Sequence, residues 1–430
     1  MMRGLRLLTA YLRERRMRFA SREALEAHQR THLARFQRML ATASPFYAGL
    51  GDRPLCEWPD MDKQRMLAHF DDINTAGLQL RQVFDAALDA ERSRDFRPRL
   101  KSINVGLSSG TSGQRGVFAI SDREAAIWAG VMLARMLPAG LLARERVALF
   151  LRANSNVYES VRSHWIAFRF FDLLQPFDDN LDALEAFDAT IIVAPAQVLR
   201  ALALRALEGG LRLRPRRVIS VAEVLEPRDR ELIASVFGPV HQVYQATEGF
   251  LASTCAHGVL HLNEGYVHVE PRWLDHERRR FIPVITDFTR LTQPFVRYRL
   301  DDVLLARQAP CPCGSACLAL DAIEGRHDDM LLLPGRRHPQ VQVFADSLSR
   351  VIAQCLPREA DYRLIQRGPA NLDLHASLDP HGMTLLQQGL LDGLARLGIA
   401  TEQLSWTCHG TVPAGEALAK CRRIVREHRA

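Results

Sequence analysis

Lysine is almost absent from this chain: only Lys63, Lys101 and Lys420 occur, against 53 arginines. The composition therefore uses arginine wherever a solvated positive charge suffices. A lysine that remains is a candidate for a role that needs a compact ammonium rather than a planar guanidinium fork. For any one of the three, retention by chance is the alternative.

The chain also lacks an apolar run near the roughly 18 residues that a membrane-spanning helix needs. Residues 1–20 are basic and amphipathic, with a short apolar stretch. We therefore expect a surface helix there, no secretory signal, no stable membrane insertion and a cytoplasmic location. The net charge of +7 is dispersed, without a basic stripe interleaved with aromatics. The dispersed charge argues against a nucleic-acid partner and is compatible with weak attraction to a nucleotide or an acidic protein.

Hydrophobic periodicity divides the 430 residues into three regions. Residues 1–100 are mainly helical, whereas strand-like and helical runs alternate from about 103 to 310, which predicts an α/β layered domain with largely parallel strands. After Gly325 the pattern becomes that of a small α+β domain. We expect a large N-terminal domain, 1–326, and a small mobile C-terminal domain, 327–430. The clearest expected strands are 147–151, 189–193, 217–221 and 240–244, and the clearest helices are 122–137, 198–207 and 229–237.

A glycine- and hydroxyl-rich segment, 108–116, follows the strand-like run 103–106. Glycines allow close approach of the backbone to a ligand, and successive N–H groups with hydroxyls form a nest for anions. The segment therefore suits a polyphosphate, although a plain turn or linker has the same composition. Its spacing differs from that of a Walker A loop.

Two further segments carry carboxylates at the ends of strand-like runs. Thr247 and Glu248 follow the strand ending at Tyr244, and Glu248 is placed to hold Mg²⁺ against phosphates. The alternative is a helix that Thr247 caps. The segments 286–287 and 297–302 suit the ribose hydroxyls and phosphates of a nucleotide, or are salt-bridged strand ends. The segment 324–330 suits a hinge or an ordinary linker.

Four soft ligands occur in two pairs about 50 residues apart, within 255–313. Without a secretory signal we expect metal binding rather than disulfides from the eight cysteines. A closed tetrahedral set of this kind is typical of structural Zn²⁺. Cys317 and His257 are competing ligands, and unligated thiols are the alternative; nothing marks one thiol as an activated nucleophile. The expected ligands are Cys255, His261, Cys311 and Cys313.

The ordered motifs together resemble the adenylate-forming superfamily, most closely its phenylacetate–CoA ligase branch and a group associated with aryl-polyene pigment pathways. The resemblance runs from Ser44-Pro45-Phe46-Tyr47 to the C-terminus. It is carried by Ser-Ser-Gly-Thr-Ser-Gly at 108–113, Tyr-Gln-Ala-Thr-Glu at 244–248, Thr-Asp at 286–287, Arg-Tyr-Arg-x-x-Asp at 297–302, Gly-Arg-x-Asp-Asp-Met at 325–330 and the terminal Lys420.

The resemblance implies a role for each motif. Glu248 would hold Mg²⁺ with Thr247 beside the phosphates, Asp302 would bind the ribose, and Arg326 would assist. Asp328 would be the hinge about which the C-terminal domain turns, and Lys420 would stabilise charge during adenylation. The cysteine–histidine set fits a structural zinc of that branch. The remaining ATP-binding residues would be Ser108, Ser109, Gly110, Thr111, Ser112, Gly113, Ala222, Glu223 and Tyr244.

The expected activity is therefore activation of a small aryl acid by ATP and its transfer to coenzyme A or to the phosphopantetheine of an acidic carrier protein. Three departures from the family pattern, Gln114-Arg115, Gln245 and Ala419, support a rival, a non-catalytic ATP-binding scaffold. A zinc-dependent nucleic-acid binder is a third possibility that the dispersed charge disfavours. We expect the acid to bind between residues 128–180 and the loop after Tyr244. The pocket walls would then include Trp128, Phe168, Phe170 and Phe171; the alternative is that these rings belong to the hydrophobic core.

Overall fold

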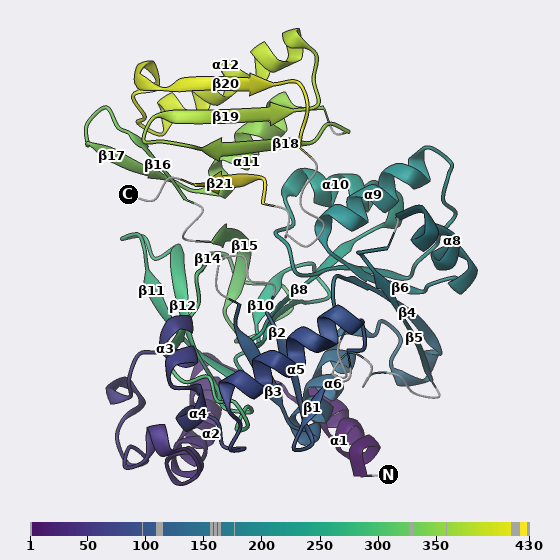
Figure 1. The fold of residues 1–430 in the computed structure, drawn as a ribbon, viewed down its shortest axis with the longest axis vertical. Helices are drawn as coiled ribbons and strands as arrows, with labels where there is room; N and C mark the ends of the chain where they lie inside the picture. The colour runs from purple at the N-terminus through teal and green to yellow at the C-terminus, as the bar shows by residue number, and fades with distance from the viewer. Residues whose placement is uncertain are drawn as a thin grey trace.

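The computed structural model describes residues 2–427, apart from 97, 109–114, 155–157, 159, 160, 162–164, 176, 327–329, 358 and 414–421. Figure 1 shows a large lower part that holds the N-terminus and a smaller upper part built from the C-terminal strands and helices. This confirms the expected combination of a large α/β domain and a small C-terminal α+β domain.

One half of the central sheet is parallel, in the order β5-β4-β6-β7-β8. Ile192 and Val218 face a core with α8, α9 and α10, whereas Ile191 and Ile219 face α1 and α6. Because helices cover both faces, these strands are apolar along their length. The elements are α6 (Asp122–Met136), β4 (Glu145–Leu151), β5 (Ile166–Asp172), α8 (Phe177–Phe187), β6 (Ile191–Ala194), α9 (Ala196–Leu207), β7 (Arg217–Ser220), α10 (Pro227–Phe237) and β8 (Val240–Ala246).

The other half of the sheet is antiparallel, so the expectation of largely parallel strands up to residue 310 was wrong there. From β8 the order continues β9-β10-β15-β14-β12-β11. The connections between several of these strands are too short for the crossover that a parallel pair requires. The strands are β9 (Gly249–Thr254), β10 (Leu260–Leu262), β11 (Val267–Trp273), β12 (Arg280–Asp287), β13 (Tyr298–Arg299), β14 (Asp302–Ala306) and β15 (Ala319–Arg326).

The N-terminal helix α1 (Met2–Arg16) packs on α6, as expected for a surface helix. A Cβ at Gly130 of α6 would lie 2.4 Å from the Leu7 carbonyl oxygen, so this close approach requires glycine. Glu14 of α1 is buried and accepts hydrogen bonds from Arg135 and Tyr266, both at 2.7 Å. Among the described residues, no helix has both the length and the apolar character needed to cross a bilayer.

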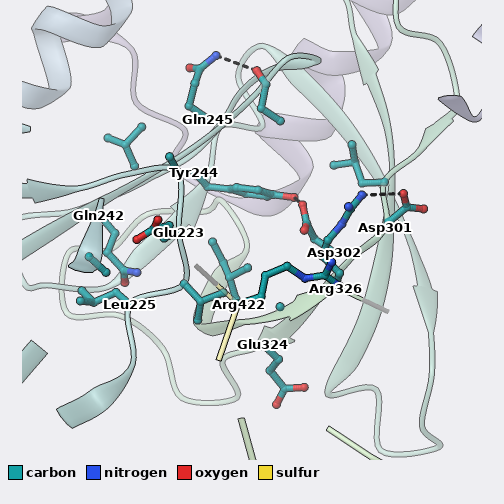
Figure 2. A pocket seen from close by; sticks show the side chains of 18 of the residues that line it. Glu223, Leu225, Gln242, Tyr244, Gln245, Asp301, Asp302, Glu324, Arg326 and Arg422 are labelled. Atoms are coloured by element: carbon teal, nitrogen blue, oxygen red, sulfur yellow. Dashed lines mark hydrogen bonds and ion pairs between the residues drawn. The ribbon is translucent and has the colours of Figure 1, made fainter. Parts of the chain in front are cut away.

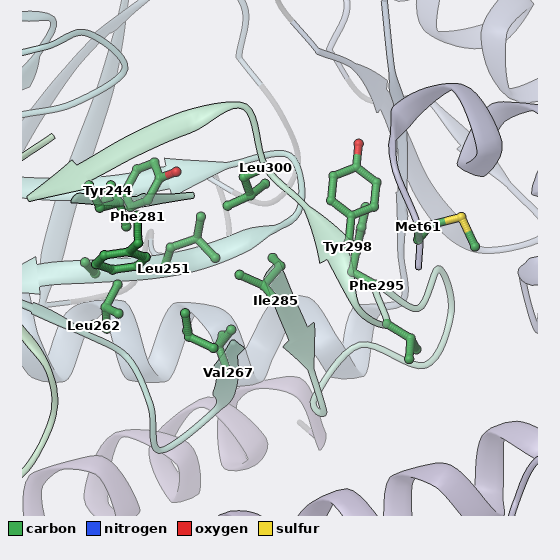
Figure 3. Packing of buried hydrophobic residues seen from close by; sticks show 14 of the residues in the cluster. Met61, Tyr244, Leu251, Leu262, Val267, Phe281, Ile285, Phe295, Tyr298 and Leu300 are labelled. Atoms are coloured by element: carbon green, nitrogen blue, oxygen red, sulfur yellow. The ribbon is translucent and has the colours of Figure 1, made fainter. Parts of the chain in front are cut away.

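A large core lies among the antiparallel strands and the segment before α3 (Figure 3). Met61 joins β13 there: its N–H donates to Arg297 O at 3.0 Å and its carbonyl accepts from Arg299 N at 2.8 Å. This bridge, formed beside Tyr298, fixes the start of α3 against the sheet. The other N-terminal elements are α2 (Arg22–Ala43), α3 (Lys63–Ala68), α4 (Phe70–Ile73), α5 (Leu80–Ser93), β1 (Arg99–Leu100), β2 (Ile103–Leu107) and β3 (Val117–Ile120).

The C-terminal domain has a hairpin and a four-stranded sheet in the order β20-β19-β18-β21. Its own core includes Leu348, Leu364, Leu374 and Leu390, all fully buried. The domain therefore has a separate hydrophobic centre. Its elements are β16 (Leu331–Pro334), β17 (Gln340–Val343), α11 (Ala345–Cys355), β18 (Tyr362–Gln366), β19 (Asn371–Ala376), α12 (Pro380–Arg396), β20 (Ser405–His409) and β21 (Ile424–Arg426).

Candidate active site

A cavity of about 440 Å³ lies where the C-terminal domain meets the central sheet. Its walls come from the β2–β3 loop, α3, the ends of β7 and β8, β14, β15 and the C-terminal chain (Figure 2). We call it the interdomain cavity. Ser109, Gly110, Thr111, Ser112, Gly113, Asp328 and Lys420 lie outside the described residues. All the other residues expected at the nucleotide site line it: Ser108, Ala222, Glu223, Tyr244, Thr247, Glu248, Asp302 and Arg326.

Two carboxylates at the start of β14 carry different partners. The Tyr244 hydroxyl at the end of β8 donates a hydrogen bond to Asp302 Oδ2, and Arg326 donates to Asp301 Oδ2 at 3.0 Å (Figure 2). Burial raises the pKa of Tyr244 well above its usual range, and the negative charge of Asp302 adds to the effect. Tyr244 therefore remains a neutral donor, and Asp302 is held in the cavity wall.

Thr247 and Glu248 form the two-residue turn between antiparallel β8 and β9. The alternative that Thr247 caps a helix is therefore wrong. Burial raises the pKa of Glu248, and Asp302 raises it further, whereas hydrogen bonds from the backbone and from Tyr298 oppose the shift. A cation near Glu248 would stabilise its charged form.

Lys63 lines the interdomain cavity, although it was assigned no role there from the sequence. It begins α3 directly after Asp62, whose side chain caps the helix by accepting from Arg65 N at 2.9 Å. Burial lowers the pKa of Lys63 and Arg326 lowers it further, whereas Glu248 and Asp301 act in the opposite direction. The rarity of lysine was the one sequence signal for this residue.

The mouth of the 108–116 loop is closed by two hydrogen bonds, from Ser108 N to Gly116 O at 2.8 Å and from Gly116 N to Ser108 Oγ at 2.7 Å. Arg115 donates to the Ser108 carbonyl at 3.0 Å and to both carboxylate oxygens of Glu91, at 2.7 and 2.5 Å. Arg115 thus links Ser108 to Glu91 of α5. A Cβ at Gly116 would lie 3.5 Å from Lys63 Cε, so the lysine lies beside this loop.

The chain turns sharply after β7. Ala222 has a φ of +66°, and Glu223 N donates to Val221 O at 2.8 Å, the i→i+2 bond of a γ-turn. Such backbone conformations are costly for a residue with a side chain and cluster at functional sites. The turn places the Ala222 backbone in the cavity wall, while Glu223 forms an ion pair with Arg152 at 3.5 Å.

A second cavity, of about 250 Å³, adjoins the first, sharing Ser108, Ala222 and Thr247. It is lined by aromatic rings that include Trp128, whose Nε1 donates to Gln245 Oε1 at 3.0 Å. We call it the aromatic cavity. Of the four expected aromatic walls, only Trp128 lines it; Phe171 belongs to the core with α8, and Phe168 packs on the core beside α6. Phe170 faces Phe96.

Cys255, His261, Cys311 and Cys313 converge, with their ligand atoms all within 4.8 Å of one another. Cys255 Sγ lies 3.7 Å from Cys311 Sγ, and Cys313 Sγ lies 3.4 Å from His261 Nε2. Tetrahedral zinc with Zn–S bonds of about 2.3 Å needs S···S separations of about 3.8 Å. His261 Nδ1 lies 3.2 Å from the Cys317 carbonyl, which would orient Nε2 toward the metal.

No protein-family model matches the sequence, and comparison with curated proteins finds no match. Solved structures do match. A 2-hydroxyisobutyryl–CoA ligase in the postadenylation state, in complex with 2-HIB-AMP, has a TM-score of 0.69 at 15% identity, over 96% of this chain and 91% of that one.

Two other solved structures match over less of the chain. An anthranilate–CoA ligase in complex with anthranoyl-AMP has a TM-score of 0.51 at 15% identity, covering 74% and 66% of the two chains. An amide bond synthetase from Marinactinospora thermotolerans has 0.52 at 17% identity, covering 75% and 68%. At these identities the likeness shows that the chain has the fold of adenylate-forming ligases.

Proposed function

We propose that this protein activates a carboxylic acid with ATP and transfers the acyl group to a thiol. The observation that carries the proposal is the interdomain cavity, which brings the hydrogen-bonded Tyr244–Asp302 pair, the Glu248 carboxylate and the Lys63 ammonium to one place. These groups suit the ribose, the metal-bound phosphates and the developing negative charge of an adenylation site. The fold and its structural neighbours support the same chemistry.

In the first step a carboxylate oxygen of the acid attacks the α-phosphorus of ATP. The acyl–phosphate bond forms, the α–β phosphoanhydride bond breaks, and pyrophosphate leaves. Lys63, and Lys420 from the C-terminal domain, would stabilise the negative charge that builds on the phosphates. Asp302 would bind the ribose hydroxyls, and Ser108 with the loop that follows it would bind the phosphates.

In the second step a thiol, having lost its proton, attacks the acyl carbon and releases AMP. We propose coenzyme A or the phosphopantetheine of an acidic carrier protein as the acceptor. Rotation of the C-terminal domain about Asp328 would replace Lys420 with the thiol between the two steps.

The donor set around the cavity fits Mg²⁺, because Glu248 offers a carboxylate beside the Thr247 hydroxyl. The ion would neutralise phosphate charge. The cysteine–histidine cluster fits Zn²⁺ as a closed structural site, because its four ligands leave no open position for substrate.

The aromatic cavity supports a small aryl acid as substrate. Its volume of about 250 Å³ and its Trp128 and Phe250 walls suit a single ring more than a long chain. A substrate of this kind agrees with the phenylacetate–CoA ligase branch and the aryl-polyene group, which the ordered motifs resemble.

The deciding experiment is ATP–pyrophosphate exchange with a panel of aryl and fatty acids. Exchange with a small aryl acid is expected, and Lys420→Ala should abolish it. Absence of exchange with every acid, in a protein shown to be folded, would sink the proposal.

A second candidate, an ATP-binding scaffold without catalysis, is favoured by the pairing of Arg115 with Glu91, because the loop's cation is engaged within the fold. It predicts ATP binding by calorimetry and no exchange with any acid.

A further inference from the structure

A buried cluster of charges joins the C-terminal domain to α10. Arg423 is only 8% exposed and forms ion pairs with Glu226 at 3.0 Å, Asp229 at 2.6 Å and Asp361 at 2.9 Å. Glu226 and Asp229 belong to the N-terminal domain, and Asp361 precedes β18 of the C-terminal domain. The Tyr362 hydroxyl donates a hydrogen bond to Glu226 Oε1 at 3.0 Å, also across the boundary.

Two arginines make the reciprocal contact from the N-terminal domain. Arg200 of α9 pairs with Asp229 at 3.3 Å and donates to the Glu359 carbonyl at 2.6 Å. Arg228 donates to the Pro357 carbonyl at 2.9 Å. The cluster therefore contains three arginines and three carboxylates, and both domains supply charges of each sign.

Buried ion pairs of this kind add little net stability, because desolvation offsets their attraction. Removing one partner is nevertheless strongly destabilising, because the other charge is then left buried and unpaired. Such pairs therefore favour the one arrangement of the two domains in which every charge has its partner. If the C-terminal domain moved away, Arg423 would lose its ion pairs with Glu226 and Asp229, and charged groups that are buried here would become exposed. A hydrophobic contact of the same area would tolerate sliding.

The charge cluster borders the interdomain cavity, because Glu226, Asp229 and Arg423 are among its lining residues. Arg422 lines the interdomain cavity, with Asp302 and Arg326 among the other wall residues (Figure 2). Lys420 precedes Arg423 by three positions in the sequence. The anchored residue and the one before it thus both line the cavity.

We propose that Arg423 is a positioning residue whose pairing with Glu226 and Asp229 fastens the C-terminal domain in this arrangement and sets Arg422 in the wall of the nucleotide site. The assignment of that cavity to a nucleotide depends on the proposed function; the fastening of the two domains does not.

The test uses Arg423→Gln and Asp229→Asn, each alone and combined, in the full-length protein. Arg367→Gln is the matched control, because Arg367 likewise pairs with more than one carboxylate, but both of its partners, Asp373 and Glu427, lie within the C-terminal domain. Small-angle X-ray scattering without ligand reports the domain arrangement, and calorimetry with Mg·ATP reports the cavity. Circular dichroism establishes that each variant is folded.

We expect the wild type and Arg367→Gln to give the scattering profile calculated from this structure. Arg423→Gln and Asp229→Asn should each increase the radius of gyration and weaken Mg·ATP binding about tenfold, because fewer molecules hold the competent arrangement. In the double variant the combined effect should be smaller than the sum of the two single effects, because both substitutions remove the Arg423–Asp229 pair. Arg422→Gln should weaken binding without changing the scattering.

Unchanged scattering in both folded variants would overturn the proposal, as would a wild type whose profile departs from the structure. Loss of folding in both would also overturn it, because the cluster would then be part of the core rather than a fastening. If no protein binds Mg·ATP, the proposed function fails while the scattering still decides on the fastening.

Discussion

The hydroxyl of Tyr244 donates a hydrogen bond to the carboxylate of Asp302, across the cavity wall between the end of β8 and the start of β14. Tyr244 is 8% exposed and belongs to the core among the antiparallel strands. The carboxylate that would bind the ribose is therefore oriented by a side chain that the hydrophobic core holds in place.

This pairing predicts that Tyr244→Phe weakens ATP binding, because the Asp302 carboxylate is then no longer oriented by the hydroxyl. Asp302→Asn should weaken binding more, because it removes the carboxylate itself. A hydrogen bond to a charged group contributes about 1.5–3 kcal/mol, which corresponds to about 10- to 100-fold in affinity for Asp302→Asn. Isothermal titration calorimetry with Mg·ATP measures both. Equal affinities for wild type and Asp302→Asn would remove Asp302 from the nucleotide site.

Lys63 provides a second prediction. Its ammonium lies in the cavity near Glu248 and Asp301, so Lys63→Gln should slow adenylation about 100-fold, the usual cost of removing one group that stabilises transition-state charge. Lys101→Gln is the matched control, because Lys101 is exposed and donates to the Gly77 carbonyl outside this cavity. Pyrophosphate exchange at saturating ATP gives the rates. Equal rates for the two variants would contradict a catalytic role.

Lys63 also shows what the sequence could not specify. The resemblance of the ordered motifs to the adenylate-forming superfamily assigned Ser108, Thr247, Glu248 and Asp302 to one nucleotide site. Lys63 has no motif, and its place depends on the hydrogen bonds between Met61 and β13, more than 230 residues later. Pairing over such a distance leaves no periodicity in either segment.

The direction of strands is a second case. Periodicity located β8 correctly but did not show that the chain reverses at Thr247 and Glu248, because strands in either orientation share the same alternation of side chains. The charge cluster around Arg423 was also invisible, since 53 arginines leave no single one distinctive.

The cysteine–histidine cluster predicts one equivalent of zinc per chain, measured by mass spectrometry of the purified protein. Cys255→Ser should release the metal and lower the unfolding temperature, because a structural site contributes its binding energy to folding. Cys408→Ser is the control, since Cys408 is exposed and in the other domain. Zinc-free wild-type protein with an unchanged unfolding temperature after chelation would contradict the assignment.

Stability should also depend on pH through His241 of β8. Burial lowers the pKa of His241 to about 4, and the nearby charges of Arg217 and Arg230 act in the same direction. An unfolded histidine titrates near 6.5, so the unfolded state binds the proton first. The stabilising contribution is complete above about pH 6.5 and is lost as the pH falls toward 4.

Thermal unfolding at pH 7.5 and pH 5 measures this effect. His241→Gln should lose less stability between the two values than the wild type, whereas His381→Gln, at an exposed position, should behave as the wild type. An identical loss in all three proteins would assign the pH dependence to other groups.

The final prediction concerns substrate size. Gln245 accepts from Trp128 Nε1 at 3.0 Å and donates to the Ala246 carbonyl at 3.0 Å, so its amide holds the indole against the aromatic cavity. Gln245→Gly removes this hold and the volume of the side chain. We expect the catalytic efficiency to rise about tenfold for acids larger than a single ring and to fall for the smallest ones. A change of this size is typical when the contacts of a substrate pocket are altered.

Trp128→Phe, which lacks the donor but keeps a ring, should shift the preference in the same direction by less. The two profiles are measured by pyrophosphate exchange over the acid panel, and a Gln245→Gly profile identical to that of the wild type would show that this contact does not limit the pocket.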